Sequence, residues 1–503
     1  MNAKSMIKGT LILTITGLIT RIMGFYYRIF LSNKIGAENL GLYQMIFPLL
    51  MLAHSLTSAG IQLVISRLVA VDAAHTSRKK HALLVGTTLS FILSIFVFLV
   101  LYTQADFLAI NILSEERCAP LLRIMAFSVP LSSIHTCIIG YYYGQQKTLL
   151  PAFSNFTEQF VRIFAVWLLC NAAVIEGREI TVSVAVYGLV LGEAGSTLLC
   201  LTALSFEQKG KFRHYSLSGT RRLTKIILRQ GIPLTANRVL LNLLQSAEAI
   251  LIPSRLQIYG LSSSESLAIY GVLTGMAMPF VLFPSTLTNA ASTLLLPGAA
   301  EAQAEQNLNS LKSTIEQTLR FCLLLGIFCS MIFCLFGHAL GNIIFQSPLC
   351  GQLLVILGWL CPFLYITSTF SSILHGLGKI SQTFCVSVVS LSLRIVFVLI
   401  FIPLFSIKGY LWGILLCQIL STFAYSVLLY RLVPFRFDAV EWIAKPLGLC
   451  IISLFIGRGL FQLLPDINLL SLIFCIGCTT LSYCLLLIVT GLLPKPPKHA
   501  HQS

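Results

Sequence analysis

Long apolar stretches recur along the whole chain, and each is long enough to cross a lipid bilayer as a helix. Of the 503 residues, 56% are hydrophobic and only 10% are charged, whereas about a quarter of the residues of a soluble domain are charged. Only helices and closed barrels satisfy their own backbone hydrogen bonds in lipid. The stretches therefore predict an all-α polytopic membrane protein.

Hydropathy predicts about fourteen transmembrane helices. The expected spans are 9–31, 41–70, 82–102, 119–144, 149–171, 180–205, 226–253, 267–296, 317–337, 351–377, 380–402, 409–430, 444–463 and 469–493. A long basic loop near the middle suggests two lobes of six spans each. The expected organisation is an N-lobe at 1–205, a basic cytoplasmic linker at 206–225, a C-lobe at 226–432, and two further spans with a basic tail at 433–503.

An internal repeat supports the two lobes. The segment 121–164 matches 353–396 without a gap at an offset of 232, the difference between positions 362 and 130. The matched pairs include Pro130 and Pro362, Gly144 and Gly376, Lys147 and Lys379, and Arg162 and Arg394. Both lobes are expected to begin on the same side of the membrane, so the repeats are parallel.

Basic residues gather in alternate loops, as they do in membrane proteins with a defined topology. By the positive-inside rule both termini are expected in the cytoplasm, and the chain in a bacterial cytoplasmic membrane. The net charge of +16 is explained by these loops, so nucleic acid is not expected as a partner.

The first span carries two arginines inside its apolar run. One helical face holds Thr10, Thr14, Gly17, Arg21, Gly24 and Arg28, which recur at steps of four and three. An arginine at the bilayer centre costs roughly 2.5–3.5 kcal/mol on the insertion scale, and it is tolerated where it faces a wet cavity. We therefore expect this face to line a cationic cavity. The alternative is that both arginines extend to the membrane interfaces.

The seventh span is the counterpart of the first in the repeat, and it carries a similar stripe. Its polar residues are Thr235, Arg238, Asn242, Gln245 and Glu248. The second span adds Ser55, Ser58 and Gln62 at helical spacing. Two lobes with polar faces indicate a central cavity. Arginines outnumber acids within the spans, so the cavity is expected to select an anion such as a pyrophosphate. The residues expected to bind it are Arg21, Arg28, Arg162, Arg238, Asn242, Gln245 and Arg394.

The remaining charges within the spans have two interpretations. Glu158 precedes Arg162 by four residues and can pair with it on one helical face. That pair is either structural or part of gating and coupling. Arg394, at the matching place in the second lobe, has no such partner in sequence. Glu193 and Glu248 could neutralise an arginine or bind a coupling cation.

Catalytic and cofactor chemistry is not expected. His54, His135 and His375 lie in separate spans without metal-ligand spacing, so no metal site is predicted. No ATPase motif is present in the sequence. Any driving force would then come from an ion gradient of Na⁺ or H⁺, from the membrane potential or from the substrate.

The run TRIMGFYYRIFLSNKIGAENLGLYQMIFPLL (20–50), followed by TSAGIQLVISRLVA (57–70), resembles the stage V sporulation protein B family. These are polysaccharide-biosynthesis members of the multidrug/oligosaccharidyl-lipid/polysaccharide flippase superfamily. Thr20, Arg21 and Gly24 also fit the first-helix pattern of lipid II flippases, but the second arginine comes one position late, at Arg28.

The resemblance implies a flippase, not an enzyme, that works by alternating access. Its cargo would be a lipid-linked glycan, namely the peptidoglycan precursor lipid II for spore cortex, with membrane lipids around it. In such relatives the last two spans help to form a groove for the lipid tail. The alternatives are another lipid-linked polysaccharide, a cation-coupled multidrug exporter, a membrane glycosyltransferase or ligase, and a scaffold.

Overall fold

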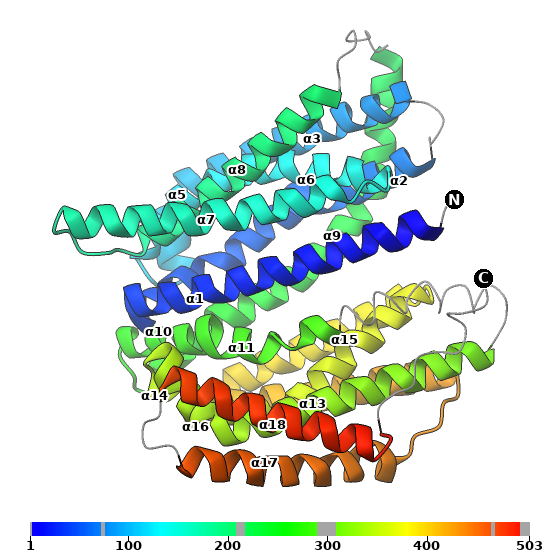
Figure 1. Ribbon diagram of the computed structural model, residues 1–503. Helices are drawn as coiled ribbons and strands as arrows, with labels where there is room; N and C mark the ends of the chain where they lie inside the picture. The colour runs from blue at the N-terminus through cyan, green and yellow to red at the C-terminus, as the bar shows by residue number, and fades with distance from the viewer. Residues whose placement is uncertain (1–2, 72–75, 208–216, 289–307, 464–467, 493–503) are drawn as a thin grey trace. The chain divides into compact units, whose positions relative to one another are not determined.

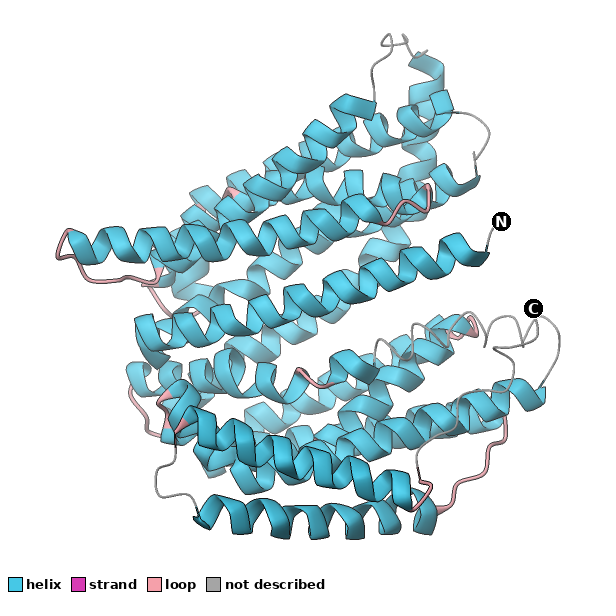
Figure 2. Ribbon diagram, in the orientation of Figure 1, coloured by secondary structure: helices cyan, strands magenta, loops and turns pink. Residues whose placement is uncertain are grey.

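All the regular secondary structure in the described part of this chain is helical. The computed structural model describes residues 3–71, 76–207, 217–288, 308–463 and 468–492. In this described part no strand occurs, and the all-α prediction is confirmed (Figure 2). Parts of three predicted features lie outside the described residues: the basic linker at 208–216, the end of the eighth span at 289–296, and the C-terminal tail at 493–503.

Ten helices of the described part are long and apolar enough to cross a membrane, and the bent pair Pro348–Gly358 and Cys361–Gly376 would make an eleventh. Helical segments cover the described residues of all fourteen predicted spans, but some predicted spans share one helix. The helix over the seventh span is not among the ten, because polar residues lower its hydropathy. The count of fourteen therefore stays a prediction.

Two long helices explain part of the difference between the fourteen predicted spans and the ten or eleven candidate spans of the structure. Helix α1 (Ala3–His54) covers the first predicted span and the start of the second, and α16 (Ile380–Leu432) covers the eleventh and twelfth. Each is interrupted by one residue with positive φ: Gly36 in α1, with φ 79°, and Ser406 in α16, with φ 57°. Glycine adopts this conformation without a steric penalty, whereas serine does not.

The described chain falls into two compact units, Met1–Gly271 and Val272–Ser503. In unit 1, α7 packs against α1 and α8, α6 packs against α2, α3 and α8, and α9 packs against α1 and α2 (Figure 1). Besides α1, its helices are η1 (Ser55–Ala59), α2 (Gly60–Val71), α3 (Thr76–Thr103), α4 (Ala105–Phe107), η2 (Leu108–Ile112), α5 (Cys118–Ala126), α6 (Ser128–Gly144), α7 (Leu149–Ile175), α8 (Ser183–Glu207), α9 (Leu217–Ile258) and α10 (Ser263–Gly271).

In unit 2, α13 packs against α14, α15 and α17, and α17 packs against α18. Besides α16, its helices are η3 (Val272–Ala277), α11 (Met278–Leu282), α13 (Leu308–Phe345), α14 (Pro348–Gly358), α15 (Cys361–Gly376), η4 (Val440–Ala444), α17 (Lys445–Leu463) and α18 (Leu469–Val489). The contact-based boundary at Gly271 differs from the sequence-based boundary at 206–225, because α9 packs within unit 1.

Candidate functional site

A polar pocket lies in unit 1 between the region around η1 and helix α9. Its cavity volume is about 420 Å³, and it is open to the exterior. Its lining residues are Met51, His54, Ser55, Ser58, Ala59, Gln62, Thr136, Arg238, Leu241, Asn242 and Gln245. Arg238 is the one arginine or lysine in this set, and none of these residues is acidic. The pocket therefore offers hydroxyl, amide and guanidinium groups to an anion.

Close packing of α9 on α1 and α2 positions this pocket. Asn242 Nδ2 donates hydrogen bonds to the Ser55 hydroxyl and, at 3.2 Å, to the Met51 carbonyl oxygen. One turn further along α9, Ser246 Oγ donates to the Pro48 carbonyl at 3.2 Å. At Gly60 the helices approach so closely that a Cβ atom would lie 2.7 Å from the carbonyl oxygen of Gly231.

The pocket also borders a π-helical turn. The segment η1 (Ser55–Ala59) interrupts the α-helical hydrogen-bonding pattern directly after His54. Single π-turns inside α-helices are rare overall. Those that occur are often found at functional sites. Here the irregular turn carries Ser55 and Ser58, both of which line the pocket.

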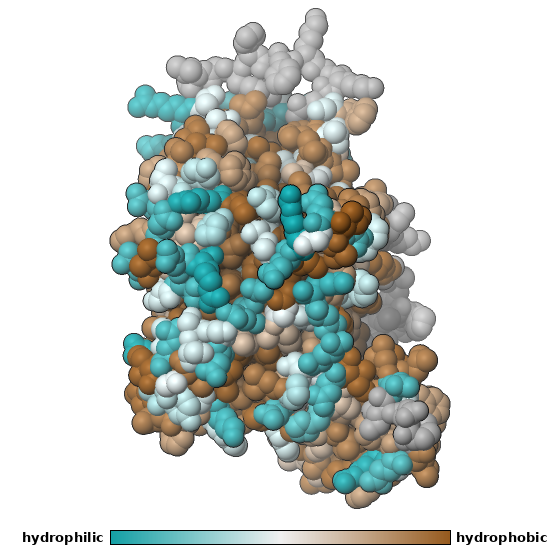
Figure 3. Space-filling view, turned by 90° about the vertical axis from the view of Figure 1, so that its left-hand side faces the viewer, coloured by the Kyte–Doolittle hydropathy of each residue, from teal (hydrophilic) through white to brown (hydrophobic). Residues whose placement is uncertain are grey.

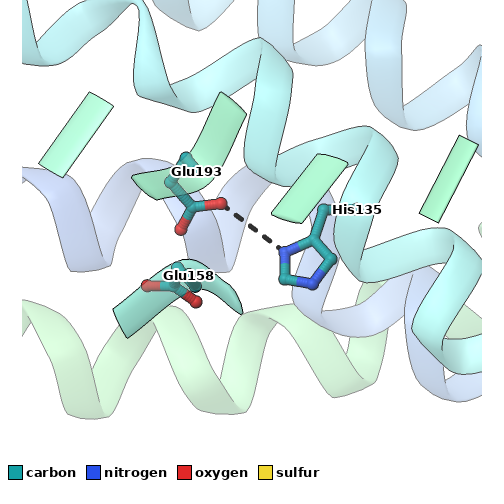
Figure 4. Close-up of side chains that lie close together, drawn as sticks. All are labelled: His135, Glu158 and Glu193. Atoms are coloured by element: carbon teal, nitrogen blue, oxygen red, sulfur yellow. Dashed lines mark ion pairs between the residues drawn. The ribbon is translucent and has the colours of Figure 1, made fainter. Parts of the chain in front are cut away.

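A second group of ionisable residues, buried or partly buried, lies in unit 1 where α6, α7 and α8 meet. It comprises His135 from α6, Glu158 from α7 and Glu193 from α8, which Figure 4 shows, together with Arg162 from α7. We call these four residues the buried quartet. Arg162 Nη2 donates a hydrogen bond to Glu158 Oε1, so the predicted ion pair is present in the structure. Its functional role stays a prediction.

The other half of the quartet is less tightly paired. His135 Nδ1 lies 3.5 Å from Glu193 Oε2, and that carboxylate oxygen has no hydrogen-bond partner although it is buried. The other ring nitrogen, Nε2, lies 2.7 Å from the hydroxyl of Ser154 on α7. The Ser154 hydroxyl in turn lies 3.3 Å from the thiol of Cys200 on α8.

Glycines let α8 approach α7 closely enough to form the quartet. A Cβ atom at Gly192, the neighbour of Glu193 in sequence, would lie 2.8 Å from the Glu158 carbonyl oxygen and 3.1 Å from Arg162 Cβ. Small residues at helix interfaces are the usual means of close packing in membranes. The glycine directly before Glu193 therefore lets the Glu193 carboxylate approach that of Glu158.

The predicted site residues fall into several places. The structure brings Arg238, Asn242 and Gln245 together in the pocket. It does not bring Arg21 there: this side chain is exposed on α1 and is not among the lining residues. Arg28, further along α1, lies close enough to Arg162 for their like charges to interact.

The two remaining candidates lie apart from these groups. Arg394 is in unit 2, where its Nη2 donates a hydrogen bond to the Tyr410 hydroxyl at 3.3 Å. Glu248 is buried on α9 in unit 1, and it is not among the residues that line the pocket.

Sequence reasoning missed His54 and His135. A search by ligand spacing fails because the quartet draws its members from three helices. The spacing does not reveal that the ligand-type atoms of His135, Glu158 and Glu193 lie within 4.8 Å of one another. One signal in the sequence could have found them: three predicted spans of one predicted lobe each carry ionisable residues. Ionisable side chains inside a membrane are costly unless they pair with one another.

An apolar pocket in unit 2 lies beside α17 and α18. Its cavity volume is about 530 Å³. Its lining residues are Ala444, Lys445, Gly448, Leu449, Ile452, Thr490 and Leu492.

Comparison with known proteins places the chain in a family. A family model described as polysaccharide biosynthesis protein matches residues 6–303, more than half of the 503 residues. The chain belongs to the polysaccharide biosynthesis protein family. This family member also matches a second model, described as MatE, over residues 218–400.

Similar proteins agree with this family. Over 98% of its length, this family member is 27% identical to "Stage V sporulation protein B" of Bacillus subtilis (strain 168), of which 97% is covered. The resemblance predicted from residues 20–70 is thereby confirmed.

Two solved structures share the fold. A structure of the lipid II flippase MurJ, in an inward closed conformation, is similar with a TM-score of 0.75 and 15% identity over 95% of this chain and 98% of that chain. An inward-facing MATE-family multidrug transporter is similar with a TM-score of 0.66 and 15% identity over 83% of this chain and 94% of that chain. The polysaccharide biosynthesis family member is thus a multi-pass membrane protein with a flippase-like and MATE-like transporter fold.

Proposed function

We propose that this protein is a flippase that moves a lipid-linked glycan precursor across the cytoplasmic membrane by alternating access. The cargo that we assign is an undecaprenyl-pyrophosphate-linked peptidoglycan precursor, lipid II, for spore cortex synthesis. Membership of the polysaccharide biosynthesis family supports a glycan cargo, and the likeness to stage V sporulation protein B supports the sporulation role. The protein acts as a transporter and not as an enzyme.

The polar pocket beside α9 is the observation that carries this proposal. Arg238, Asn242 and Gln245 line it together with hydroxyl groups from the second predicted span. A pyrophosphate bears negative charge on several oxygens, and a guanidinium binds such oxygens through charge-assisted hydrogen bonds. Amides and hydroxyls suit the sugar hydroxyls of the head group. We therefore assign the head group to this pocket.

The apolar pocket beside α17 and α18 supports a place for the lipid tail. Leu449, Ile452 and Leu492 line it, and a polyprenyl chain would bury apolar surface there. Both termini are proposed to be cytoplasmic, as the basic loops predict. Glu158, Glu193 and Glu248 are proposed to act in coupling or gating, with Na⁺, H⁺ or the membrane potential as the driving force.

The test is a reconstituted flipping assay. Purified full-length protein is placed in liposomes with lipid II, and an impermeant enzyme reports which head groups become exposed on the far side. Replacing Arg238 by alanine removes a charge-assisted contact of about 1.5–3 kcal/mol, so the initial rate should fall about tenfold or more. Arg21→Ala is measured in parallel, because Arg21 lies on the polar stripe of the first span.

Arg229→Ala is the matched control. Arg229 is an exposed arginine on the same helix, nine residues before Arg238 and about half a turn away around the helix. It is not among the residues that line the pocket, so its removal should leave the rate near that of the wild type. Equal losses for Arg238→Ala and Arg229→Ala would remove the pocket from the proposal. Absence of lipid II flipping by the wild type would remove the cargo.

Cation-coupled export of small drugs is the second candidate, because the MatE model matches residues 218–400 and a MATE-family transporter shares the fold. The acid-free lining of the pocket favours an anion over an organic cation. The same liposomes distinguish the two functions when they are loaded with a lipophilic cationic dye. Dye efflux without lipid II flipping would support the exporter.

A further inference from the structure

The buried quartet has an unbalanced charge. Glu158 and Glu193 each contribute one negative charge when ionised, and Arg162 contributes one positive charge. With His135 neutral, the quartet carries one net negative charge in the interior of a helical bundle, and Glu193 is only 9% exposed. Burying an uncompensated charge is costly, so the group favours one additional positive charge.

The geometry offers a specific place for that charge. The imidazole Nδ1 of His135 faces Glu193 Oε2 at 3.5 Å, and this buried oxygen makes no hydrogen bond (Figure 4). A proton on the His135–Glu193 pair would either charge the imidazole that faces this oxygen or neutralise the carboxyl, and in both cases it would neutralise the quartet. No other change in the quartet is needed, because Arg162 already serves Glu158.

The opposite side of the ring can accommodate both protonation states of His135. In the neutral ring with a proton on Nδ1, Nε2 accepts a hydrogen bond from the Ser154 hydroxyl. In the charged ring Nε2 donates to the same hydroxyl oxygen. The Ser154 hydroxyl can reverse direction because the Cys200 thiol beside it, at 3.3 Å, can act as a donor or an acceptor.

A metal ion fits these residues less well than a proton does. The ligand-type atoms of His135, Glu158 and Glu193 lie within 4.8 Å of one another, but the Arg162 guanidinium already holds the Glu158 carboxylate. A cation at the centre would have to displace that guanidinium or lie against its positive charge. A neutral imidazole is also a poor ligand for Na⁺, a hard cation that prefers oxygen.

Other titratable groups surround the quartet. From α1, Tyr27, Tyr43 and Arg28 face Arg162, and His54 lies close enough to Glu193 and His135 for their charges to interact. From α8, Cys200 faces the ring of His135 through Ser154. Arg28 is not among the groups whose charges act most strongly on the carboxylates of Glu158 and Glu193.

His54 connects the quartet with the polar pocket, because it also lines that pocket. Its position means that a change in the charge of the His135–Glu193 pair alters the electrostatic potential at the pocket wall. A proton on the pair would make the pocket more attractive to an anion, and loss of the proton would make it less so.

We propose that the buried quartet of unit 1 binds one exchangeable proton, carried by the His135–Glu193 pair, and that this proton is the ion coupled to transport. The proton is taken from water and returned to water, and no covalent bond between heavy atoms changes. The coupling rests on the proposed flippase function, whereas the binding of the proton does not.

Proton binding is tested without any substrate. Infrared spectra of the purified full-length protein in detergent are recorded from about pH 4 to about pH 10, a range that covers ordinary carboxyl and imidazole groups. The wild type should show one titration step in which carboxyl and imidazole bands change together. Both Glu193→Gln and His135→Gln should lose that step.

His375→Gln is the matched control. The His375 ring also contacts a hydroxyl, that of Thr383 at 2.8 Å, but it lies in unit 2. This variant should keep the coupled step. Circular dichroism and gel filtration verify folding, and His135→Gln decides the question if Glu193→Gln does not fold. A step that persists in both quartet variants would overturn the proposal, as would a shift of the step by Na⁺.

Coupling is tested in the flipping assay with an imposed pH gradient. The wild-type rate should change with the gradient, and the rate of Glu193→Gln should not. Gradient-independent wild-type flipping would refute the coupling. If the coupled titration step is present but lipid II is not moved, proton binding stands and the proposed cargo fails.

Discussion

At the scale of single residues, Arg117 joins three segments of unit 1. Its guanidinium lies 2.6 Å from Glu38 Oε1, just after the bend in α1, and 2.7 Å from Glu115 Oε1. The Ser263 hydroxyl at the start of α10 donates to Glu115 Oε2 at 2.9 Å.

Figure 3 looks onto the side of Figure 1 on which α7 turns back into α8, and hydrophilic residues gather there at the helix ends.

The pKa of Glu115 responds to this arrangement. Partial burial raises the pKa of its carboxyl, but hydrogen bonds from Arg117 and Ser263, together with the charge of Arg117, lower it by more. The net pKa lies below the ordinary value. A carboxyl whose pKa is lower in the folded state stabilises the protein above its unfolded pKa, and this contribution is lost as the pH falls through the folded pKa.

Arg117→Ala should therefore lower stability near neutral pH and make little difference in acid. Because Arg117 is half-exposed, the loss should be about 1 kcal/mol or less. Thermal unfolding in detergent at about pH 7 and below about pH 4 measures the difference from the wild type. Arg178→Ala is the control, since Arg178 pairs with exposed Glu176, at 3.2 Å. An Arg117→Ala deficit of the same size at both pH values would contradict the assignment.

At the scale of elements, glycines allow close contacts between helical segments in both units. On α8, a Cβ atom at Gly188 would lie 2.2 Å from a methyl carbon of Val166 on α7. On α16, a Cβ atom at Gly413, after the break at Ser406, would lie 2.6 Å from Cβ of Phe397, which precedes the break. In both places the missing side chain of glycine leaves room for the neighbouring segment.

Gly192→Ala should destabilise the protein and disturb the quartet. The new methyl group would meet the Glu158 carbonyl oxygen at 2.8 Å, and neither backbone can yield easily. Overpacking of this kind costs about 1–3 kcal/mol. The expected results are a lower unfolding temperature in detergent and a changed infrared titration step.

Gly477→Ala is the matched substitution on α18, where a Cβ atom meets nothing within 4 Å. It should leave stability unchanged or raise it slightly, because alanine favours helix more than glycine does. If both substitutions had the same effect, the close contact between α7 and α8 would not be the cause.

At the scale of the whole molecule, the topology can be tested directly. The positive-inside rule predicts that both termini are cytoplasmic, and that the turn between α7 and α8 at Gly177 is outside. Alkaline phosphatase, which is active only outside the cytoplasm, should be active when fused after residue 177 and inactive when fused after residue 503. A fluorescent protein that folds only in the cytoplasm should give the opposite result. Reversed activities would invert the predicted orientation.

The sequence by itself determined the fold class and the family of this protein. The length of the apolar stretches, their helical periodicity and the turn-forming residues are local properties of the sequence. In lipid, such a stretch forms a helix because the helix satisfies all of its backbone hydrogen bonds internally. The run at 20–70 was specific enough to indicate the stage V sporulation protein B family, which the similarity over 98% of the chain confirmed. The ion pair of Glu158 and Arg162 was also local, since four residues separate them.

Only the tertiary structure decided which distant residues meet. The polar stripe of α9 could be read from its periodicity, but its partners Ser55 and His54 depend on how α9 packs against α1 and α2. Periodicity places a residue on a helical face without stating which helix that face contacts. His135 illustrates this limit most clearly: its chemistry depends on Glu193 and Ser154, which come from two other helices, and only the close approach of α6, α7 and α8 joins them.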